Sequence, residues 1–191
     1  MKVCIIGNGL ISLTLSRALV NIGISVDVYY NRKVKNQNLS RTLGISATNV
    51  QYFNKHIINI DQIRWEINNI KIYTEKFLKD EFLNFSNTNK HLFSILANYK
   101  LYNLLDLSLK KNKLFRYKKN SDLKKIIKQN YNLIINSEFN HEITKKYFSN
   151  MIKKKYNSFA FITCINHKKL QSNNIAIQIF TNNGPIAFLP I

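Results

Sequence analysis

Acidic residues are scarce in this chain of 191 residues: ten Asp and Glu stand against 29 Lys and Arg, which leaves a formal net charge of +19. Such a charge attracts nucleic acid, anionic lipid or an acidic partner. The lysines, however, fall in scattered pairs and triplets, and Asn and Ile are enriched with them, as expected for an A- and T-rich coding sequence. A dedicated nucleic-acid surface is therefore disfavoured, whereas weak attraction to anionic lipid or an acidic partner is physically reasonable.

Cysteines and long apolar runs are also scarce. Cys4 and Cys164 lie in apolar, strand-like runs without the spacing of a zinc site or a redox pair, which predicts buried free thiols in a reducing compartment. The apolar N-terminal stretch is interrupted at once by Gly7-Asn8-Gly9, so no signal peptide is expected, and no run reaches the length of a spanning helix. We therefore expect a cytoplasmic protein, with peripheral association at the inner face of the membrane as the alternative location.

Glycine and proline are rare as well, with five and two residues. Asparagine is abundant and tolerates left-handed backbone, so it is expected to form many of the turns. An apolar fraction of 45% with 12% aromatic residues excludes a disordered chain, and the length suits one domain or slightly more. No metal site is predicted, because the four histidines show no ligand spacing: His56, His91, His141 and His167. No nucleophile elbow or carboxylate pair is visible either, so the catalytic residues stay unassigned.

The N-terminus is the most informative segment. A short apolar run ends in Gly7-Asn8-Gly9 and leads into residues 10–20, whose pattern is typical of a helix. This is the strand, tight turn and helix N-terminus of a dinucleotide-binding βαβ unit. Gly7 permits the turn, Gly9 lets the backbone approach a pyrophosphate, and Ser12 replaces the third glycine. The second strand, 26–30, ends in a tyrosine where an acid normally binds the ribose hydroxyls.

Alternation and helical spacing predict the remaining elements. They are a helix from Ser46 through Val50, Phe53 and Ile57, strands at 70–74 and 81–85, a helix at 99–110, parallel strands at 113–117 and 131–136, and β-rich segments at 158–166 and 174–191. The first part is therefore predicted to be α/β with a parallel sheet, and the tail to form a second, antiparallel region.

The order of four segments resembles the flavin-dependent aromatic-ring hydroxylases, in particular the ubiquinone-biosynthesis hydroxylases related to p-hydroxybenzoate hydroxylase. These segments are 5–12, similar to the FAD pyrophosphate turn; 41–46, similar to the stretch whose arginine lies on the flavin side; 95–101, similar to the start of the helix beside the isoalloxazine; and 178–190, similar to the substrate-domain signature around Gly-Pro. The resemblance implies a Rossmann-like FAD-binding domain at 1–66 and 92–150, and an incomplete antiparallel β substrate domain at 67–91 and 151–191.

The resemblance also implies the site. It assigns FAD binding to Gly7, Asn8, Gly9, Leu10, Ile11, Ser12, Arg41 and Asn98, and the substrate side to Phe180, Gly184 and Pro185. Apolar side chains are expected to share the inner face of the substrate-domain strands: Phe180, Ile186, Phe188 and Ile191. A family member uses reduced FAD and O₂ to hydroxylate an electron-rich ring, with NAD(P)H as reductant. The substrate would be a small aromatic or polyprenyl-phenol compound, and other ubiquinone-biosynthesis proteins would be partners.

Several departures accompany the resemblance. Tyr30 replaces the ribose-binding acid, the family's Asp-Gly pair reads Glu138-Phe139, and residues 117–131 leave little room for the family's β-meander. The chain ends before the family's second flavin motif. These departures predict a truncated hydroxylase, or one piece of a split enzyme whose partner is a C-terminal half, inactive alone and weak in FAD binding. The alternatives are a degenerate non-catalytic remnant, a basic interaction module, or an NAD(P)-binding protein of another class.

Overall fold

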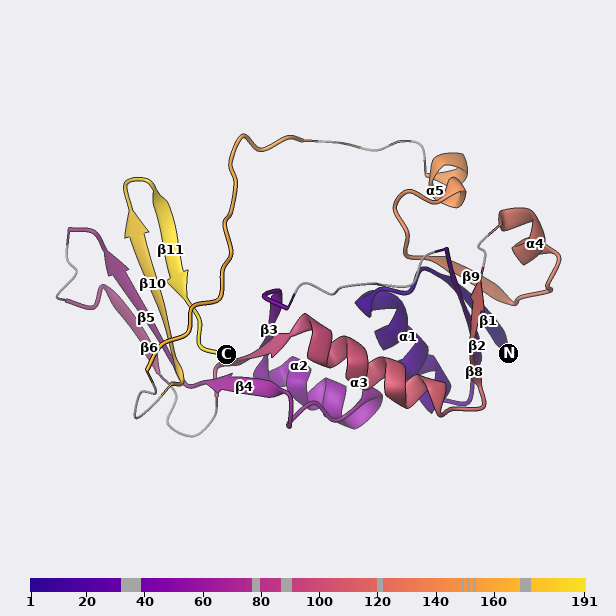
Figure 1. Cartoon of the computed structure of the whole chain (residues 1–191), viewed down its shortest axis with the longest axis horizontal. Coiled ribbons are helices and arrows are strands. Elements are labelled where there is room, and N and C mark those ends of the chain that lie inside the picture. Colours follow the sequence, from indigo (N-terminus) through magenta and orange to yellow (C-terminus); the bar gives the residue numbers. More distant parts are fainter. Residues whose placement is uncertain are drawn as a thin grey trace. The chain divides into compact units, whose positions relative to one another are not determined.

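The computed structural model describes residues 1–31, 39–76, 80–86, 91–119, 122–148, 150, 152, 154–168 and 173–191. The chain forms two compact units (Figure 1). Unit 1 comprises Met1–Asn38, His56–Ile58 and Leu101–Phe161, and unit 2 comprises Leu39–Lys55, Asn59–Lys100 and Ile162–Ile191. The domain boundaries expected from the sequence stay a prediction. The two units are defined by which parts of the chain lie close together, whereas the expected domains are defined by the cofactor and the substrate that they would bind.

Unit 1 is built on a parallel sheet of four strands in the order β8-β2-β1-β9. The strands are β1 (Lys2–Ile6), β2 (Ser25–Tyr30), β8 (Phe115–Lys119) and β9 (Leu133–Asn136), and every neighbouring pair is parallel. All four were predicted from the sequence. Because β2 and β8 extend the sheet on one side of β1 and β9 on the other, the strand order reverses at β1, as in a doubly wound nucleotide-binding fold.

Helices cover both faces of this sheet, which explains why β1 is apolar after Lys2: Val3, Cys4, Ile5 and Ile6 are fully buried. Helix α1 (Leu10–Asn21) packs on β1 and β2. Helix α3 (Asn98–Lys110) buries Leu101, Leu105 and Leu109, and its Asp106 accepts a hydrogen bond from Tyr117 of β8 at 2.6 Å.

Two short helices cover the other face. From α4 (Leu123–Ile127) and α5 (Glu142–Tyr147), Ile126 and Ile143 pack into one apolar cluster with Cys4, Ile6 and Tyr29. Neither helix was predicted, since each is only one or two turns long. The turn before β9 contains Asn130 at φ 49°, which confirms at this position that asparagine serves in left-handed backbone.

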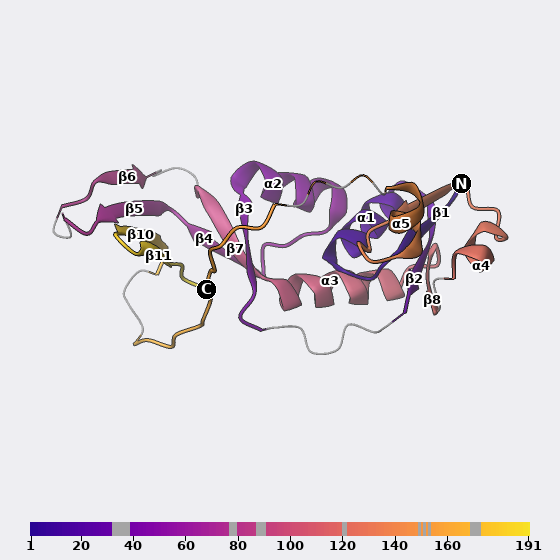
Figure 2. The same cartoon turned by 90° about the horizontal axis from the view of Figure 1, so that it is seen from above.

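Unit 2 contains two sheets (Figures 1 and 2). One has the order β11-β10-β5-β6, with β5 (Asn69–Thr74), β6 (Leu83–Ser86), β10 (Ile175–Thr181) and β11 (Gly184–Phe188). The other is antiparallel, with β3 (Thr42–Ser46), β7 (Phe93–Ala97) and β4 (Arg64–Ile67) in the order β3-β7-β4. Strands β5 and β10 pair in parallel, so the tail belongs to a mixed sheet and not to a purely antiparallel one.

Helix α2 (Ala47–Tyr52) begins where expected, because the Ser46 hydroxyl accepts a hydrogen bond from the Asn49 N–H at 3.2 Å. It continues as a π-helical turn, Phe53–Ile57. Val50 and Ile57 are buried, as the predicted apolar face requires.

Two expectations about the tail are wrong. The segment 158–166 forms no strand among the described residues, and Phe159 and Phe161 are 88% and 96% exposed. A strand needs a pairing partner, and β-rich composition alone does not provide one. Cys164 lies in this segment and is exposed, whereas Cys4 is buried as predicted.

The expected common face of Phe180, Ile186 and Phe188 is also wrong. In the β10–β11 hairpin, Ile179 pairs with Ile186 and Phe180 with Pro185. Paired residues share a face and neighbours along a strand do not. Phe180 therefore lies on the face opposite to Ile186 and Phe188. Ile191 lies beyond the end of β11.

Candidate functional site

The turn after β1 requires glycine at its first position. Gly7 is buried and has φ +107°, and its N–H donates to the Tyr29 carbonyl at 2.8 Å. A Cβ at this position would lie 2.4 Å from Ser137 Oγ and 2.9 Å from Glu138 Cγ. Both the backbone conformation and the close packing therefore exclude a side chain.

A chain of hydroxyl groups lies beneath this turn. Ser137 Oγ donates to the Ile6 carbonyl at 2.8 Å and lies 2.6 Å from the Oγ of fully buried Ser12. Since Ser137 uses its only proton on the carbonyl, Ser12 must donate to Ser137. Ser12 thus packs closely, as a third glycine would, and in addition links α1 to the end of β9. Sequence reasoning missed Ser137, because its position follows from the placement of β9 beside β1.

The start of α1 is open to a ligand. Gly9 is its N-cap, at φ −77° and ψ 178°, and neither a capping side chain nor an acidic residue occupies the first turn. A Cβ at Gly9 would meet no described atom within 4 Å. Asn8 and Leu10 are half-buried and Ile11 is 77% exposed. The free N–H groups of a helix N-terminus bind phosphate, and this one lies at the carboxyl end of β1, where the strand order reverses. The residues present therefore fit a diphosphate.

The loop after β9 forms the other wall of this turn. The Asn136 side chain donates to the Glu138 carbonyl at 3.1 Å and to Thr144 Oγ1 at 2.7 Å, and its Oδ1 accepts from the Glu138 N–H at 3.0 Å. These bonds hold Glu138 against Gly7. Phe139 adopts no positive φ, so the loop does not need the glycine that the family pattern has there.

The ribose end of the site lacks an acid. Tyr30, at the end of β2, is half-buried, and its ring meets that of Tyr117 edge-on at 5.7 Å between centroids. Asp27 on the same strand is 1% exposed and lies 3.1 Å from Lys118 Nζ and 3.3 Å from Lys2 Nζ. A carboxylate committed to two lysines inside the fold is not available to a ribose.

Asp27 accepts a further hydrogen bond of 2.5 Å from the Tyr131 hydroxyl, which lies 3.1 Å from the Tyr29 hydroxyl. Burial by itself raises the pKa of Asp27, but the bonds from Tyr131, Lys118 and Lys2 outweigh it and hold the pKa below its ordinary value. The same surroundings, burial first and then the Asp27 carboxylate, raise the pKa of Tyr131. This cluster is therefore an ion-pair and hydrogen-bond network inside unit 1, built around the Asp27 carboxylate.

Unit 2 brings two of the expected flavin-side residues together. Thr42 pairs with Ala97 across β3 and β7, and the Asn98 N–H donates to the Arg41 carbonyl at 2.9 Å. Arg41 is exposed. The Asn98 Oδ1 is buried and has no hydrogen-bond partner among the described residues. An unsatisfied buried carbonyl oxygen is costly, and a donor on a bound ligand would satisfy it.

The three residues expected on the substrate side lie in the β10–β11 hairpin. Gly184 has φ +120°, and its carbonyl accepts from Thr181 Oγ1 at 2.7 Å across the turn. Phe180 and Pro185 are paired on one face of the hairpin, and the Phe180 side chain is 48% exposed. The pattern around Gly-Pro therefore forms a tight hairpin with an exposed aromatic beside its turn.

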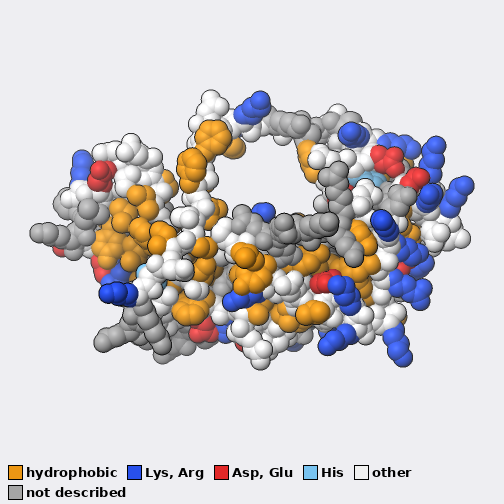
Figure 3. All heavy atoms as spheres, viewed as in Figure 1, with side chains coloured by type: hydrophobic (Ala, Val, Ile, Leu, Met, Phe, Trp, Pro, Cys, Tyr) orange, Lys and Arg blue, Asp and Glu red, His pale blue; other side chains and the backbone are white. Residues whose placement is uncertain are grey.

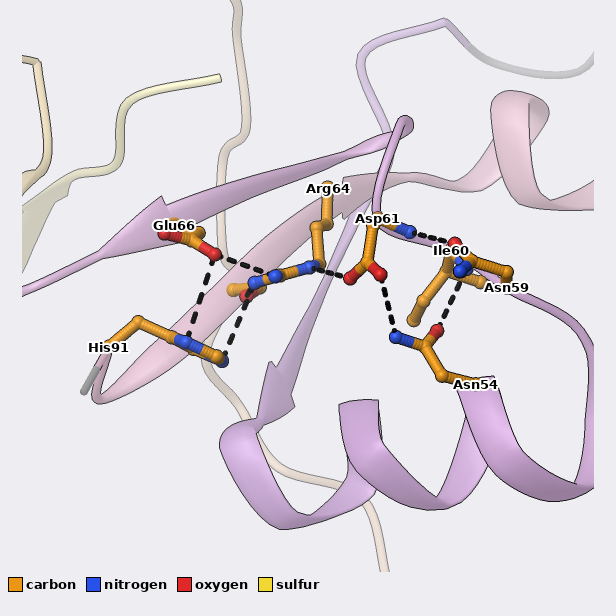
Figure 4. A network of polar contacts seen from close by, with 8 residues as sticks. Asn54, Asn59, Ile60, Asp61, Arg64, Glu66 and His91 are labelled. Atoms are coloured by element: carbon orange, nitrogen blue, oxygen red, sulfur yellow. Dashed lines mark hydrogen bonds and ion pairs between the residues drawn. The ribbon is translucent and has the colours of Figure 1, made fainter.

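The densest polar cluster of unit 2 surrounds Arg64 (Figure 4). The guanidinium contacts Asp61 at 2.7 Å, Glu66 at 2.6 Å and Ser94 Oγ at 3.1 Å. The hydrogen bond from Arg64 lowers the pKa of Asp61, so Asp61 is not a candidate proton acceptor. We interpret the cluster as structural, because it links β4 to β7 through Ser94 and to the loop before β4 through Asp61. The part of the chain that the structure describes contains no group of three His, Cys, Asp or Glu suited to a metal ion, and none of its helices is long and apolar enough to cross a bilayer.

Comparison with known proteins gives a likeness in structure alone. No protein-family model and no curated protein sequence matches the chain. Among solved structures, a variant of PqsL from P. aeruginosa matches all of the chain, with a TM-score of 0.69 and 11% identity over 57% of its own length. Another structure of PqsL, described as a probable FAD-dependent monooxygenase from Pseudomonas aeruginosa, matches 82% of the chain over 48% of its own, at a TM-score of 0.59 and 10% identity.

The p-nitrophenol 4-monooxygenase PnpA from Pseudomonas putida matches 62% of the chain over 31% of its own, with a TM-score of 0.51 and 14% identity. The chain thus spans between 31% and 57% of the length of these three structures. At such low identity the likeness concerns the fold, which in this chain combines a parallel sheet flanked by helices with two further sheets. The chain has the fold of FAD-dependent monooxygenases.

Proposed function

We propose that this chain binds FAD as part of a monooxygenase that hydroxylates aromatic rings. The observation that carries the proposal is the uncapped N-terminus of α1 with open space beside Gly9, in a chain with the fold of FAD-dependent monooxygenases. When bound, FAD supplies the redox chemistry with O₂, and the protein supplies position, a dry pocket and electrostatic control.

Each residue of the candidate site has a distinct task in this proposal. Gly7 allows the chain to turn, and Gly9 keeps the diphosphate in contact with the backbone N–H groups of residues 10–12. The family resemblance assigns two residues of unit 2, Asn98 and Arg41, to the same cofactor. Asn98 has an unsatisfied carbonyl oxygen, and its backbone N–H bonds to the Arg41 carbonyl. Phe180 and Pro185 contribute apolar surface on the substrate side.

The substrate class rests on the resemblance of residues 178–190 to the substrate-domain signature of the ubiquinone-biosynthesis hydroxylases. We propose a small aromatic or polyprenyl-phenol substrate, NAD(P)H as the reductant, and other proteins of ubiquinone biosynthesis as partners. Phe180, which is 48% exposed and shares a face of the hairpin with Pro185, suits contact with a hydrophobic molecule.

FAD binding by residues 1–191 should be weak. Without an acid at position 30, a charged hydrogen bond to the ribose is lost, at a cost of about 1.5–3 kcal/mol, or roughly tenfold to a hundredfold in affinity. Glu138 adds a negative charge beside the turn, which also opposes a diphosphate.

Flavin fluorescence quenching with the full chain tests the proposal. Gly9→Ala should lower FAD affinity at least about tenfold, because its Cβ projects into the space for the diphosphate, while circular dichroism stays unchanged. Gly44→Ala is the matched control: its Cβ would meet only Phe93 Cδ2 at 3.9 Å, so binding should be retained.

Equal affinity of the Gly9→Ala and wild-type chains would show that the turn is structural only. A wild-type chain that binds NADH but not FAD would indicate an NAD(P)-binding protein of another class. Copurification of tightly held, stoichiometric FAD would contradict the expected weak affinity, but not the proposed cofactor.

A further inference from the structure

The layer formed by α4 and α5 presents positive charge to solvent. Ile126 and Ile143 face the sheet, and the lysines of this layer are all exposed: Lys124, Lys125, Lys128, Lys145 and Lys146. Two acids belong to the same helical segments, Asp122 as the N-cap of α4 and Glu142 in the first turn of α5. The lysines therefore exceed the acids, and Figure 3 shows blue side chains crowded over the part of the surface that carries α4.

Exposed apolar side chains lie among these lysines. Ile127 is 55% exposed, Tyr147 59% and Phe148 67%. The Lys146 ammonium lies 5.1 Å from the centroid of the Tyr147 ring. Large apolar side chains are normally buried by the fold, so their grouping at one surface indicates a partner that accepts both charge and apolar contact.

The chain that follows α5 continues the same composition. Its described residues include two exposed lysines, Lys154 and Lys155. They also include four apolar side chains that are each at least 75% exposed: Ile152, Tyr156, Phe159 and Phe161. We define the basic–aromatic surface as the solvent side of α4 and α5 together with these residues. All of it belongs to unit 1.

We propose that the basic–aromatic surface docks unit 1 on an anionic lipid bilayer. Lysines gain electrostatic attraction at a negatively charged membrane, and Tyr, Phe and Ile gain from insertion at the headgroup level. Nucleic acid would match the charge and could stack on the aromatic rings, but the exposed aliphatic side chains of Ile127 and Ile152 have no role in stacking. An anionic lipid bilayer accounts for both the exposed lysines and the exposed apolar side chains. The proposal goes beyond the cofactor site and does not depend on flavin binding.

Cosedimentation of the full chain with lipid vesicles tests this docking. Binding to phosphatidylcholine vesicles should be weak and should rise strongly when phosphatidylglycerol is added. Each lysine contributes about 1 kcal/mol near such a surface, so Lys124→Glu with Lys125→Glu should lower the partition coefficient by roughly thirtyfold or more. Phe159→Ser with Phe161→Ser should remove the part of the binding that survives high salt.

The matched control is Lys111→Glu with Lys113→Glu. These exposed lysines precede β8, outside α4 and α5, and their substitution changes the net charge equally, so binding should fall by less than about threefold. Equal losses in the two charge-reversal variants would overturn the proposal, because net charge alone would then explain binding. The proposal also fails if the wild-type chain binds single-stranded oligonucleotides but ignores anionic vesicles, or if it binds neutral and anionic vesicles alike.

Discussion

Replacing Gly7 by alanine tests the packing under the turn most directly. At φ +107° an L-residue is strained by about 1–3 kcal/mol. The new methyl would lie 2.4 Å from Ser137 Oγ, so Ser137 must move and lose its bonds to Ser12 and the Ile6 carbonyl. The Ile6 carbonyl keeps the Ser137 backbone N–H as a donor, but the buried Ser12 hydroxyl loses its acceptor, which costs about 1–3 kcal/mol more. The sum predicts about 2–6 kcal/mol of destabilisation.

Gly9→Ala is the natural reference for this variant, since it makes the same chemical change two residues away. Its φ of −77° is ordinary, and its Cβ meets no described atom, so its stability should stay within about 0.5 kcal/mol of wild type. The midpoint of thermal unfolding, measured by circular dichroism, should be roughly 10 °C lower for Gly7→Ala than for wild type. The midpoint of Gly9→Ala should be unchanged. If the two variants unfold at the same temperature, the proposed packing of Ser137 against Gly7 is wrong.

Two further predictions concern buried ionisable groups. Because the pKa of Asp27 is lowered in the folded chain, its contribution to stability is present above the ordinary carboxyl pKa and is lost as the pH falls through the folded value. Asp27→Asn should therefore destabilise the chain at pH 7, by about 1–3 kcal/mol, and the difference from wild type in urea unfolding should shrink in acid; a constant difference would contradict the ion-pair network. Burial, followed by the Asp27 carboxylate, raises the pKa of the Cys4 thiol to about 12, whereas Cys164 is exposed. A thiol reagent at pH 8 should thus modify one cysteine of the native chain and two of the unfolded chain, and Cys164→Ser should abolish the native reaction; two fast-reacting thiols in the native chain would show that β1 is not buried.

The elements that the sequence predicts well are those whose signal is local. The fully apolar run before Gly7 and the glycine spacing after it suffice to predict β1, α1 and the turn between them. Strand β4, in contrast, reads Arg-Trp-Glu-Ile, an alternation of only four residues in which Ile67 is buried but Trp65 is 41% exposed. A pattern this short does not identify a strand by itself. Its pairing with β7 is what makes it a strand, and no local pattern contains that information.

The errors in the tail have the same origin. Residues 158–166 are rich in strand-forming side chains, yet nothing among the described residues pairs with them. Phe180 was expected on the face of Ile186, but the register of the hairpin is set by its turn, and one residue of shift reverses the face. At the candidate site, Gly7, Gly9 and Ser12 follow from the motif, whereas Ser137 requires knowledge that β9 lies next to β1.

The hydroxyl chain between Ser12 and Ser137 also determines when the turn can reach its final form as the protein folds. Strands β1 and β2 are neighbours in the sequence and pair across a single helix, so this unit can form early. Ser137 must return across 125 residues to reach Ser12 and 131 to reach Ile6, and contacts between residues so distant in sequence form slowly. A chain still being synthesised would thus contain the whole glycine motif long before Ser137 packs beneath it. The nucleotide binding proposed above would then appear late, after β9 has joined the sheet.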